Sequence, residues 1–147
     1  MNVINSMKIT FPSKSANESF ARSAVSAFLL PLDPTVAEIA DVKTAVSEAV
    51  TNVIVHAYPD QFGTVYIDVK LTDKGKAIIK IRDTGVGIPD IEKAMEPLYT
   101  TSTDERACLG FAVMQSFMDK VKVRSKEGKG TTVTLEKNIL RAAYAKK

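Results

Sequence analysis

The stretch Glu48-Ala49-Val50-Thr51-Asn52-Val53-Ile54-Val55-His56 says more about the fold and chemistry of this chain than any other. It lies in a segment whose apolar residues recur every three or four positions, the pattern of a helix that faces a core. Glu48, Asn52 and His56 are spaced by four, so each lies about 40° around the helix from the last and all share one stripe. An acid beside an amide can bind a hard metal ion and handle a proton. The alternative is a solvated helix face, and for His56 a capping or packing role.

The composition is that of one ordinary globular domain, which we expect to span residues 1–147. Hydrophobic residues make up 45% and charged residues 25% of the chain, both typical of soluble domains. A net charge of +3 and a pI near 8.9 are too weakly basic to indicate a nucleic-acid partner, which usually shows as a dense basic face or tail. We therefore expect no direct contact with nucleic acid.

The single cysteine, Cys108, excludes an intramolecular disulfide and favours a reducing compartment. Residues 1–20 lack the continuous apolar core of a signal peptide, and no apolar run approaches the ~20 residues of a membrane span. We therefore expect a cytoplasmic protein that does not contact a membrane.

The first half of the chain predicts one strand and two helices. Loose alternation predicts a strand over residues 3–11. Ser15 and Glu18 have the spacing of a capping box, and Pro31 ends the helix that follows. The apolar face expected for this helix consists of Phe20, Ala24, Ala27 and Phe28. Asp33 or Thr35 caps the second helix, which Tyr58-Pro59-Asp60 ends.

The second half predicts four strands and one helix. Strands are expected over residues 64–71 and 77–82, joined by a hairpin turn, and over 120–125 and 131–137. Residues 90–107 are expected to form a long loop with one short helical piece, followed by a helix over 109–118. The order predicts an α+β fold, a two-layer α/β sandwich whose mostly antiparallel, mixed sheet carries helices on one face.

Three further motifs accompany the helix stripe. Asp83-Thr84-Gly85-Val86-Gly87 follows a strand, where its glycines permit close backbone approach; alone it is also an ordinary turn. Glu105 to Phe111 joins the long loop to a helix, whose free N–H groups suit a phosphate. Arg106 can add charge-assisted hydrogen bonds there, or lie solvated in the loop. Gly130-Thr131-Thr132 enters the last strand with hydroxyls able to reach a ligand, or is a plain turn.

Together the four motifs resemble the ATP-binding domain shared by gyrase, 90-kilodalton heat-shock chaperones, histidine kinases and mismatch-repair ATPases, which has the Bergerat-type fold. The resemblance covers nearly the whole chain. Val46 to Asn52, Asn17 to Arg22, Asp83 to Glu92, Pro97 to Thr101 and Gly110-Phe111 are most similar to the bacterial serine kinases that double as anti-sigma factors, in particular their sporulation branch.

The resemblance implies a role for each matching residue. Glu48 would be the general base toward a substrate serine, and Asn52 the Mg²⁺ ligand. Asp83 would accept from the adenine amino group, while Gly85 and Gly87 let the loop pass close to ATP. Residues 88–110 would form a lid over the phosphates, with Arg106 near the γ-phosphate. The remaining nucleotide contacts implied are Thr100, Thr101, Gly110, Phe111, Thr131 and Thr132.

The resemblance also implies partners: a sporulation sigma factor of the sigma F type, an anti-anti-sigma protein as phosphorylation substrate, and a second copy in a homodimer. Arg22 is the expected partner contact, with a solvated arginine as the alternative. The chain departs from the family at Cys108, where the second glycine box usually has glycine; a need for positive φ there would cost of order 1 kcal/mol or more. A nucleotide-sensing anti-sigma module with weak or lost kinase activity, and the general-stress kinase, are the alternative functions. A detached histidine kinase domain is disfavoured because His56 is the only histidine.

Overall fold

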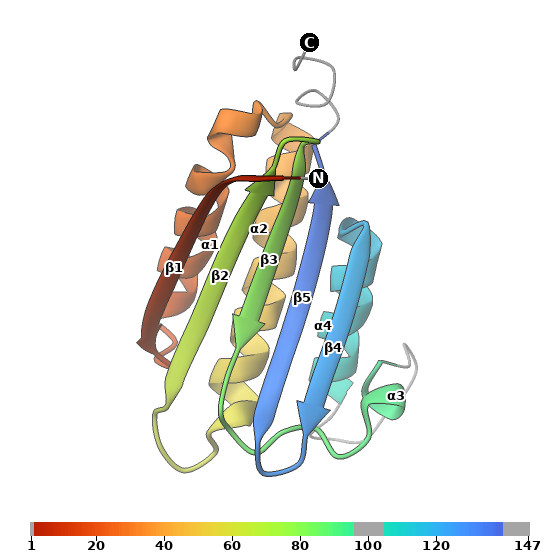
Figure 1. The fold of residues 1–147 in the computed structure, drawn as a ribbon. Coiled ribbons are helices and arrows are strands. Elements are labelled where there is room, and N and C mark those ends of the chain that lie inside the picture. Colours follow the sequence, from red (N-terminus) through yellow and green to blue (C-terminus); the bar gives the residue numbers. More distant parts are fainter. Residues whose placement is uncertain (1, 96–104, 140–147) are drawn as a thin grey trace.

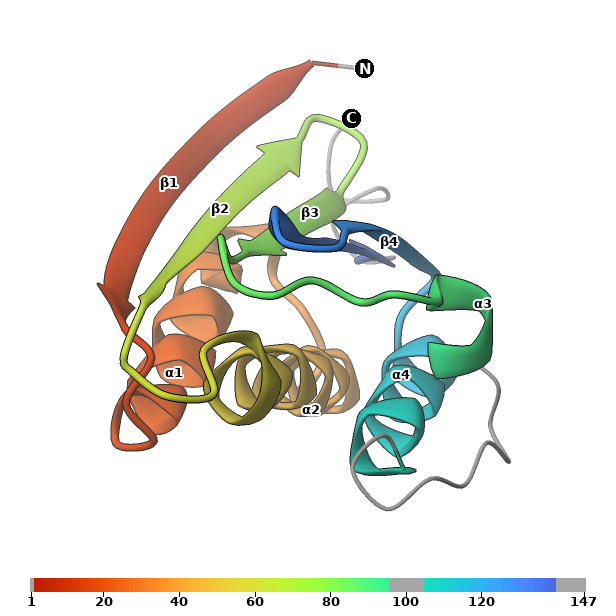
Figure 2. The same cartoon turned by 90° about the horizontal axis from the view of Figure 1, so that it is seen from below.

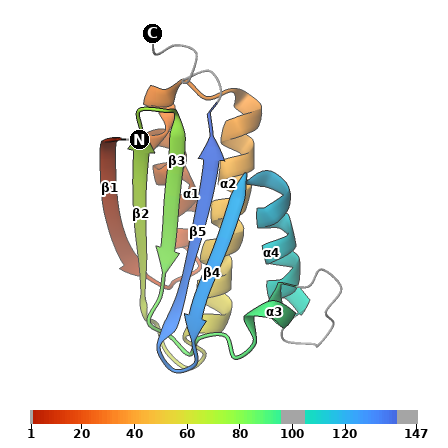
Figure 3. The ribbon, with the colours of Figure 1, turned by 45° about the vertical axis from the view of Figure 1, so that its right-hand side comes forward.

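A computed structural model describes residues 2–95 and 105–139 of the chain. They form two layers, a five-stranded sheet with helices on one of its faces (Figures 1 and 3). The strand order is β1-β2-β3-β5-β4, and each of the four neighbouring pairs is antiparallel. The predicted α+β sandwich is therefore confirmed, and the described strands contain no parallel pair.

The element order is close to the order expected from the sequence. The strands are β1 (Val3–Pro12), β2 (Thr64–Thr72), β3 (Lys76–Arg82), β4 (Lys120–Lys126) and β5 (Gly130–Asn138). The helices are α1 (Asn17–Phe28), a 3-10 turn (Leu30–Leu32), α2 (Val36–Asn52), a π-helical turn (Val53–Ala57), α3 (Ile91–Ala94) and α4 (Glu105–Phe117).

The core lies between the sheet and the helices because alternate residues of the inner strands are apolar. Ile67, Ile79 and Leu135 lie on the face toward the helices and are at most 1% exposed. Their sequence neighbours point to the other face, which no helix covers in the described part of the chain (Figure 2). One face of the sheet therefore builds the core and the other meets solvent.

Helix α2 begins and packs as its sequence predicts. Thr35 caps it: the Thr35 Oγ1 accepts from the Glu38 backbone N–H at 3.1 Å, and the Glu38 carboxylate accepts from the Thr35 N–H at 2.8 Å. Its stripe of Val42, Val46 and Val50 is fully buried against the sheet. This stripe fixes the rotation of α2 and so determines where the polar stripe lies.

Helix α1 differs from the prediction in its start and in its buried face. Its N-cap is Ala16, without a side-chain cap, so the predicted Ser15–Glu18 capping box is absent; the Glu18 carboxylate instead lies 3.5 Å from Arg22. Its buried residues are Ala21, Val25 and Ser26, and Leu29 directly after the helix is buried too. Small Ala21 lets α1 approach α2 closely, whereas Phe20 is 53% exposed and packs edge-on against Phe11 at 6.1 Å.

Helix α4 begins at Glu105, earlier than the predicted start at Leu109. Phe111, Met114 and Met118 form its buried side as expected, whereas Phe117 is 39% exposed. Lys137 of β5 contacts two helices of the other layer, donating to the last-turn carbonyl of Phe117 in α4 at 2.6 Å and pairing with Asp41 of α2 at 3.1 Å. Within the described residues, no helix is long and apolar enough to cross a membrane.

Candidate functional site

A cavity of about 350 Å³ opens at the end of the sheet where α2 finishes. The segment after β3 runs past this end of α2 toward α3, and the β4–β5 turn lies beside it (Figure 2). Most of the lining is apolar, which suits a flat organic ring, and a few polar groups can orient a ligand. The polar lining residues are Asn52, His56, Asp83, Glu127 and Thr131.

The acid and the amide of α2 lie side by side against α4. A Cβ atom built on Gly110 would lie 3.1 Å from the Glu48 carboxylate and 3.2 Å from the Asn52 Nδ2. Only glycine at this position of α4 leaves those two polar side chains uncrowded. The Asn52 Nδ2 is buried and has no hydrogen-bond partner among the described residues. Such an orphaned amide, beside a carboxylate at the mouth of a cavity, is suited to an external ligand.

A π-helical turn carries His56 to the same cavity. π-helical turns occur mostly as single turns and often at functional sites. The turn ends at Ala57, whose carbonyl accepts the backbone N–H of Val86 at 2.9 Å. A Cβ atom built on Gly85 would lie 2.1 Å from the oxygen of that carbonyl, so the two atoms would overlap. The glycine turn therefore rests directly on the end of α2, and Gly85 is needed for that contact.

Asp83 is a buried acid that lines the same cavity, with only 5% of its surface exposed. The backbone N–H groups of Gly85 and Thr131 both donate to its Oδ1, at 2.9 and 3.3 Å. Because both donors use Oδ1, the second oxygen, Oδ2, is the acceptor that Asp83 can offer to a ligand. Burial raises the pKa of Asp83 above its ordinary value, although these two hydrogen bonds and the charge of Arg82 act in the opposite direction.

Ser125 of β4 joins the glycine turn to the β4–β5 turn. Its Oγ accepts the Ile88 N–H at 2.7 Å and lies 3.0 Å from the Gly130 carbonyl and 2.8 Å from the Thr131 Oγ1. Gly87, at φ +77°, and Gly130, at φ +105°, adopt left-handed backbone that favours glycine. This network fixes the segment on which Ile88 and Pro89 line the cavity.

The structure brings together most of the residues that the sequence indicated. Asn52, Asp83, Gly87, Phe111 and Thr131 line the cavity, and His56 does too. Glu48 and Gly110 lie beside Asn52, and Gly85 supports the turn. These placements join four motifs that are far apart in the sequence.

Four of the predicted site residues are placed elsewhere or only in part. Thr132 points to the opposite face of the sheet, where it pairs with Arg82, so its prediction as a nucleotide contact is wrong for this arrangement. Thr100 and Thr101 lie outside the described residues. Arg106 lies in the first turn of α4, but its side chain is outside the described part.

Arg22 is on α1 and does not line the cavity. Its guanidinium pairs with Glu18 one turn earlier and remains 44% exposed. This position fits the separate, partner-binding role expected for it from the sequence.

The sequence did not single out three residues that shape the site. Glu127 lines the cavity from a segment interpreted only as a turn, and Ser125 was interpreted only as part of a strand. The Tyr58 hydroxyl donates to the Thr64 carbonyl at 2.8 Å and accepts the Thr84 N–H at 2.9 Å, which braces the residue after Asp83. Ser125 and Tyr58 act through hydrogen bonds to backbone in other segments, and no local pattern reveals such bonds.

The side-chain oxygens at Asn52 and Glu48 suit a metal ion that also binds the phosphate groups of a ligand. Within the described residues, no group of three or more His, Cys, Asp or Glu side chains could hold a metal by itself. Mg²⁺ keeps several waters and is commonly held by one or two protein oxygens together with substrate phosphates. The amide of Asn52 beside the Glu48 carboxylate is compatible with that mode of binding.

Comparison with known proteins gives consistent results. The histidine kinase-like ATPase domain family matches residues 11–137. A protein of Caldanaerobacter subterraneus named anti-sigma F factor is 54% identical over 95% of this chain and 97% of its own length. Another anti-sigma F factor, from Clostridium acetobutylicum, is 53% identical over 92% of this chain and 94% of its own length.

Solved structures share the fold at low sequence identity. The RsbU and RsbW domains of a Mycobacterium tuberculosis protein superpose with a TM-score of 0.67 at 18% identity, covering 92% of this chain and 32% of that one. A blue-light activated histidine kinase of Erythrobacter litoralis superposes with a TM-score of 0.59 at 18% identity, covering 81% and 41%. Both agree with the predicted Bergerat-type architecture.

The contact between Gly85 and Ala57 predicts a steric defect. Gly85→Ala should lower the free energy of unfolding by roughly 1–3 kcal/mol, because the added methyl overlaps a backbone carbonyl that cannot move aside easily. Urea unfolding measures the change. Gly128→Ala is the matched control: its Cβ would meet nothing within 4 Å, so only the left-handed backbone costs energy, about 1 kcal/mol. A Gly85→Ala protein as stable as wild type would contradict the close contact.

The raised pKa of Asp83 predicts a pH-dependent stability. Burial favours the protonated carboxyl of Asp83 in the folded state. The contribution of Asp83 to the free energy of unfolding therefore falls as the pH rises from the ordinary pKa of an aspartate through the raised pKa of Asp83. Asp83→Asn should therefore gain stability relative to wild type between about pH 4 and pH 7. Urea unfolding of both proteins across this range measures the difference. A stability difference between the two proteins that does not change with pH, or that shrinks as the pH rises, would contradict the raised pKa of Asp83.

Proposed function

The chain belongs to the histidine kinase-like ATPase family and, within it, to the anti-sigma F factors, and on this premise we propose its activity. It binds and inhibits a sporulation sigma factor of RNA polymerase, and it uses Mg-ATP to phosphorylate a serine of the anti-anti-sigma protein that opposes it. We place this activity in the cytoplasm and in a single domain over residues 1–147.

One observation carries the proposal: Asn52, with Glu48 beside it, and the buried Asp83 meet at the same cavity. Asp83 offers Oδ2 to an exocyclic amine, and Asn52 and Glu48 lie where α2 meets α4. An adenine nucleotide has its amino group at one end and its phosphates at the other. The cavity therefore offers Asp83 to the amino group and Asn52, beside Glu48, to Mg²⁺ and the phosphates.

Each residue then has a role that its position allows. Asp83 accepts a hydrogen bond from the adenine amino group, and Gly85 and Gly87 keep the turn close to the base. Asn52 helps to hold Mg²⁺, an ion that neutralises phosphate charge when bound. Glu48 accepts the proton of the substrate serine hydroxyl, as a general base.

The remaining contacts belong to the segment over the phosphates. Residues 88–110 form a lid that excludes water, which favours transfer to serine over hydrolysis. Thr100, Thr101 and Arg106 contact the phosphates in this proposal, with Arg106 near the γ-phosphate. The start of α4 at Glu105 supports this role, since a helix N-terminus attracts phosphate.

The partner surface lies apart from the cavity, on α1 and β1. Arg22 of α1 is the proposed contact with the sigma factor and the antagonist, because it is half-exposed and lies away from the cavity lining. Strand β1 is at the edge of the sheet and exposes Val3 and Ile4. An exposed edge strand is available for pairing with another chain, which supports a homodimer formed at this side.

Two alternatives remain distinct from this proposal: a nucleotide-sensing anti-sigma module with weak or lost kinase activity, and the general-stress kinase. The first was suggested by Cys108 in the second glycine box. Cys108 lies inside α4, where right-handed backbone suits any L-residue, so a left-handed conformation is not required of it. This removes the main reason to expect lost activity.

Glu48→Gln tests the kinase mechanism. The amide keeps the size of the side chain but cannot accept the serine proton, so phosphorylation of the anti-anti-sigma protein should fall at least about 100-fold. Binding of ATP and of the sigma factor should be retained. Radiolabel transfer and calorimetry measure the two properties. Asp60→Asn, an exposed acid beyond the end of α2, is the control.

Two outcomes would contradict the proposal. If Glu48→Gln transfers phosphate at the wild-type rate, Glu48 is not the base. If wild-type protein binds ATP and sigma factor but leaves the antagonist unmodified, the nucleotide-sensing module is the correct function.

A further inference from the structure

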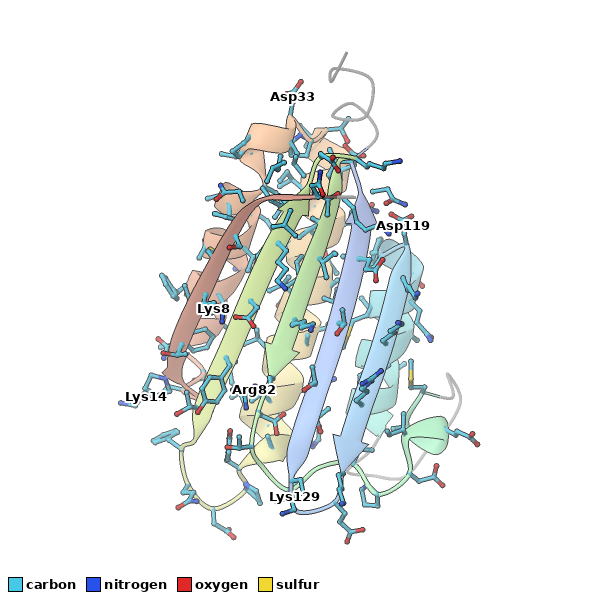
Figure 4. All side chains as sticks on the ribbon, in the orientation of Figure 1. Lys8, Lys14, Asp33, Arg82, Asp119 and Lys129 are labelled. Atoms are coloured by element: carbon cyan, nitrogen blue, oxygen red, sulfur yellow. The ribbon has the colours of Figure 1, made fainter. Side chains whose placement is uncertain are left out.

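The face of the sheet opposite the helices concentrates the positive charge of the molecule. The strand register aligns side chains across all five strands, so that residues from distant parts of the sequence form rows on this face. Figure 4 shows Lys8 of β1 and Arg82 of β3 on the face turned away from the helices. We call this surface, made of three cross-strand rows, the basic face.

The middle row carries the most cations. It runs Lys8, Asp68, Lys80, Thr134 and Lys122 across β1, β2, β3, β5 and β4. Its three lysines are exposed. Such a row presents cations across the whole width of a sheet whose strands are about 4.8 Å apart.

The rows on either side add further cations. One runs Thr10, Tyr66, Arg82, Thr132 and Arg124, and the other runs Ser6, Lys70, Ile78, Glu136 and Lys120.

The three rows hold seven cations and two carboxylates, so their formal charge exceeds the +3 of the entire chain. Of the two carboxylates, Glu136 is already paired with Lys76, at 3.1 Å. The mild net charge of the chain, from which we expected no direct contact with nucleic acid, therefore conceals a strongly basic surface and a remainder that is acidic on balance. This distribution of charge reverses that expectation in the proposal that follows.

The centre of the basic face is hollowed. A depression of about 270 Å³ is lined by the cations Lys8, Lys80 and Arg82, by the hydroxyl-bearing residues Thr10, Tyr66 and Thr132, and by Ile9 and the carboxylate Asp68. The Arg82 guanidinium lies over the Tyr66 ring at 3.9 Å from its centroid, which fixes its position. Cations and hydroxyls in this arrangement can contact phosphate oxygens.

The chemistry of the basic face discriminates among polyanionic partners. Protein interfaces have apolar cores enriched in aromatic residues. None of the large apolar side chains that are well exposed in the described chain lies in these three rows, so neither an acidic protein nor membrane insertion has an anchor here. Two copies of this face would repel one another. Nucleic-acid interfaces are polar and strongly positive, as this face is.

We propose that the basic face binds the phosphate backbone of duplex nucleic acid, without reading its sequence. Single strands are held largely by bases stacking on aromatic rings. Tyr66 is the one aromatic residue in the three rows, and Arg82 already covers its ring. The face therefore suits paired strands, whose bases need no stacking surface. This surface is separate from the nucleotide cavity, because Arg82 and Asp83 point to opposite faces of the sheet.

Fluorescence anisotropy with a labelled duplex DNA of about 25 base pairs tests the proposal. Wild-type full-length protein should bind with a dissociation constant in the micromolar range at low salt, and log affinity should fall linearly with log salt concentration. Replacing Lys8, Lys80 and Lys122 together by glutamine should weaken binding at least tenfold at 50 mM salt. The salt slope should become shallower by about one for each lysine that contacts a phosphate.

The matched control replaces Lys14, Lys43 and Lys74 by glutamine, which removes the same charge from positions outside the three rows. Its affinity should stay within about threefold of wild type. Thermal unfolding and ATP binding verify that both triple variants are folded. If the face variant does not fold, Arg124→Gln on the edge strand β4 provides the same comparison, and it should weaken binding severalfold and lower the slope by about one.

Several results would overturn the proposal. One is that duplex DNA does not bind at 50 mM salt. Another is that the face variant and the control variant weaken binding equally, which would show that binding depends on net charge alone. Tighter binding of single-stranded DNA would overturn the choice of paired strands. Binding of poly-glutamate or of phosphatidylserine vesicles as tight as that of duplex DNA at the same salt would assign the face to an acidic protein or a membrane.

Discussion

The cavity depends on how closely the turn after β3 approaches the end of α2. Gly85 has no side chain, so the Ala57 carbonyl can lie where a Cβ would be and can accept the Val86 N–H. That contact holds the turn, and the turn positions Asp83. The hydrogen bonds to Asp83 Oδ1 from Gly85 and Thr131 tie this acid to the turn and to β5 respectively. Without this approach the buried acid and the acid–amide pair of α2 would have no common cavity.

The two faces of the sheet have different consequences for function. The inner face builds the core that sets the rotation of α2, and thereby places Glu48 and Asn52 against Gly110. The outer face carries rows of cations whose alignment follows only from the strand register. The same five strands therefore support a nucleotide cavity at one end of the core and, in our proposal, a polyanion surface on the opposite side. The two surfaces meet at consecutive residues, Arg82 and Asp83.

Periodicity was sufficient to predict the sheet and the helix α2, whereas the site residues were indicated by the motifs and by the family resemblance that the motifs carry. The prediction failed where two local signals competed or where register mattered. Ser15 and Glu18 have the spacing of a capping box, but the Glu18 carboxylate pairs with Arg22 instead. Thr131 and Thr132 were equally good candidates in sequence, and strand alternation sends only Thr131 to the cavity. Ser125, Tyr58 and the basic face depend on contacts between distant segments, which no local pattern contains.

Nucleotide selectivity at Asp83 tests the central claim most directly. Because the Gly85 and Thr131 N–H groups both bond Oδ1, an asparagine there must keep its oxygen at that position and turn its NH₂ group to the ligand. Calorimetry with ATP and inosine triphosphate, on wild type and Asp83→Asn, exploits this. Wild type should prefer ATP, and the variant should lose ATP affinity at least about tenfold while its preference shifts to inosine triphosphate, whose ring carbonyl accepts a hydrogen bond. An unchanged ATP affinity and preference in Asp83→Asn would show that this cavity does not hold the base as we propose.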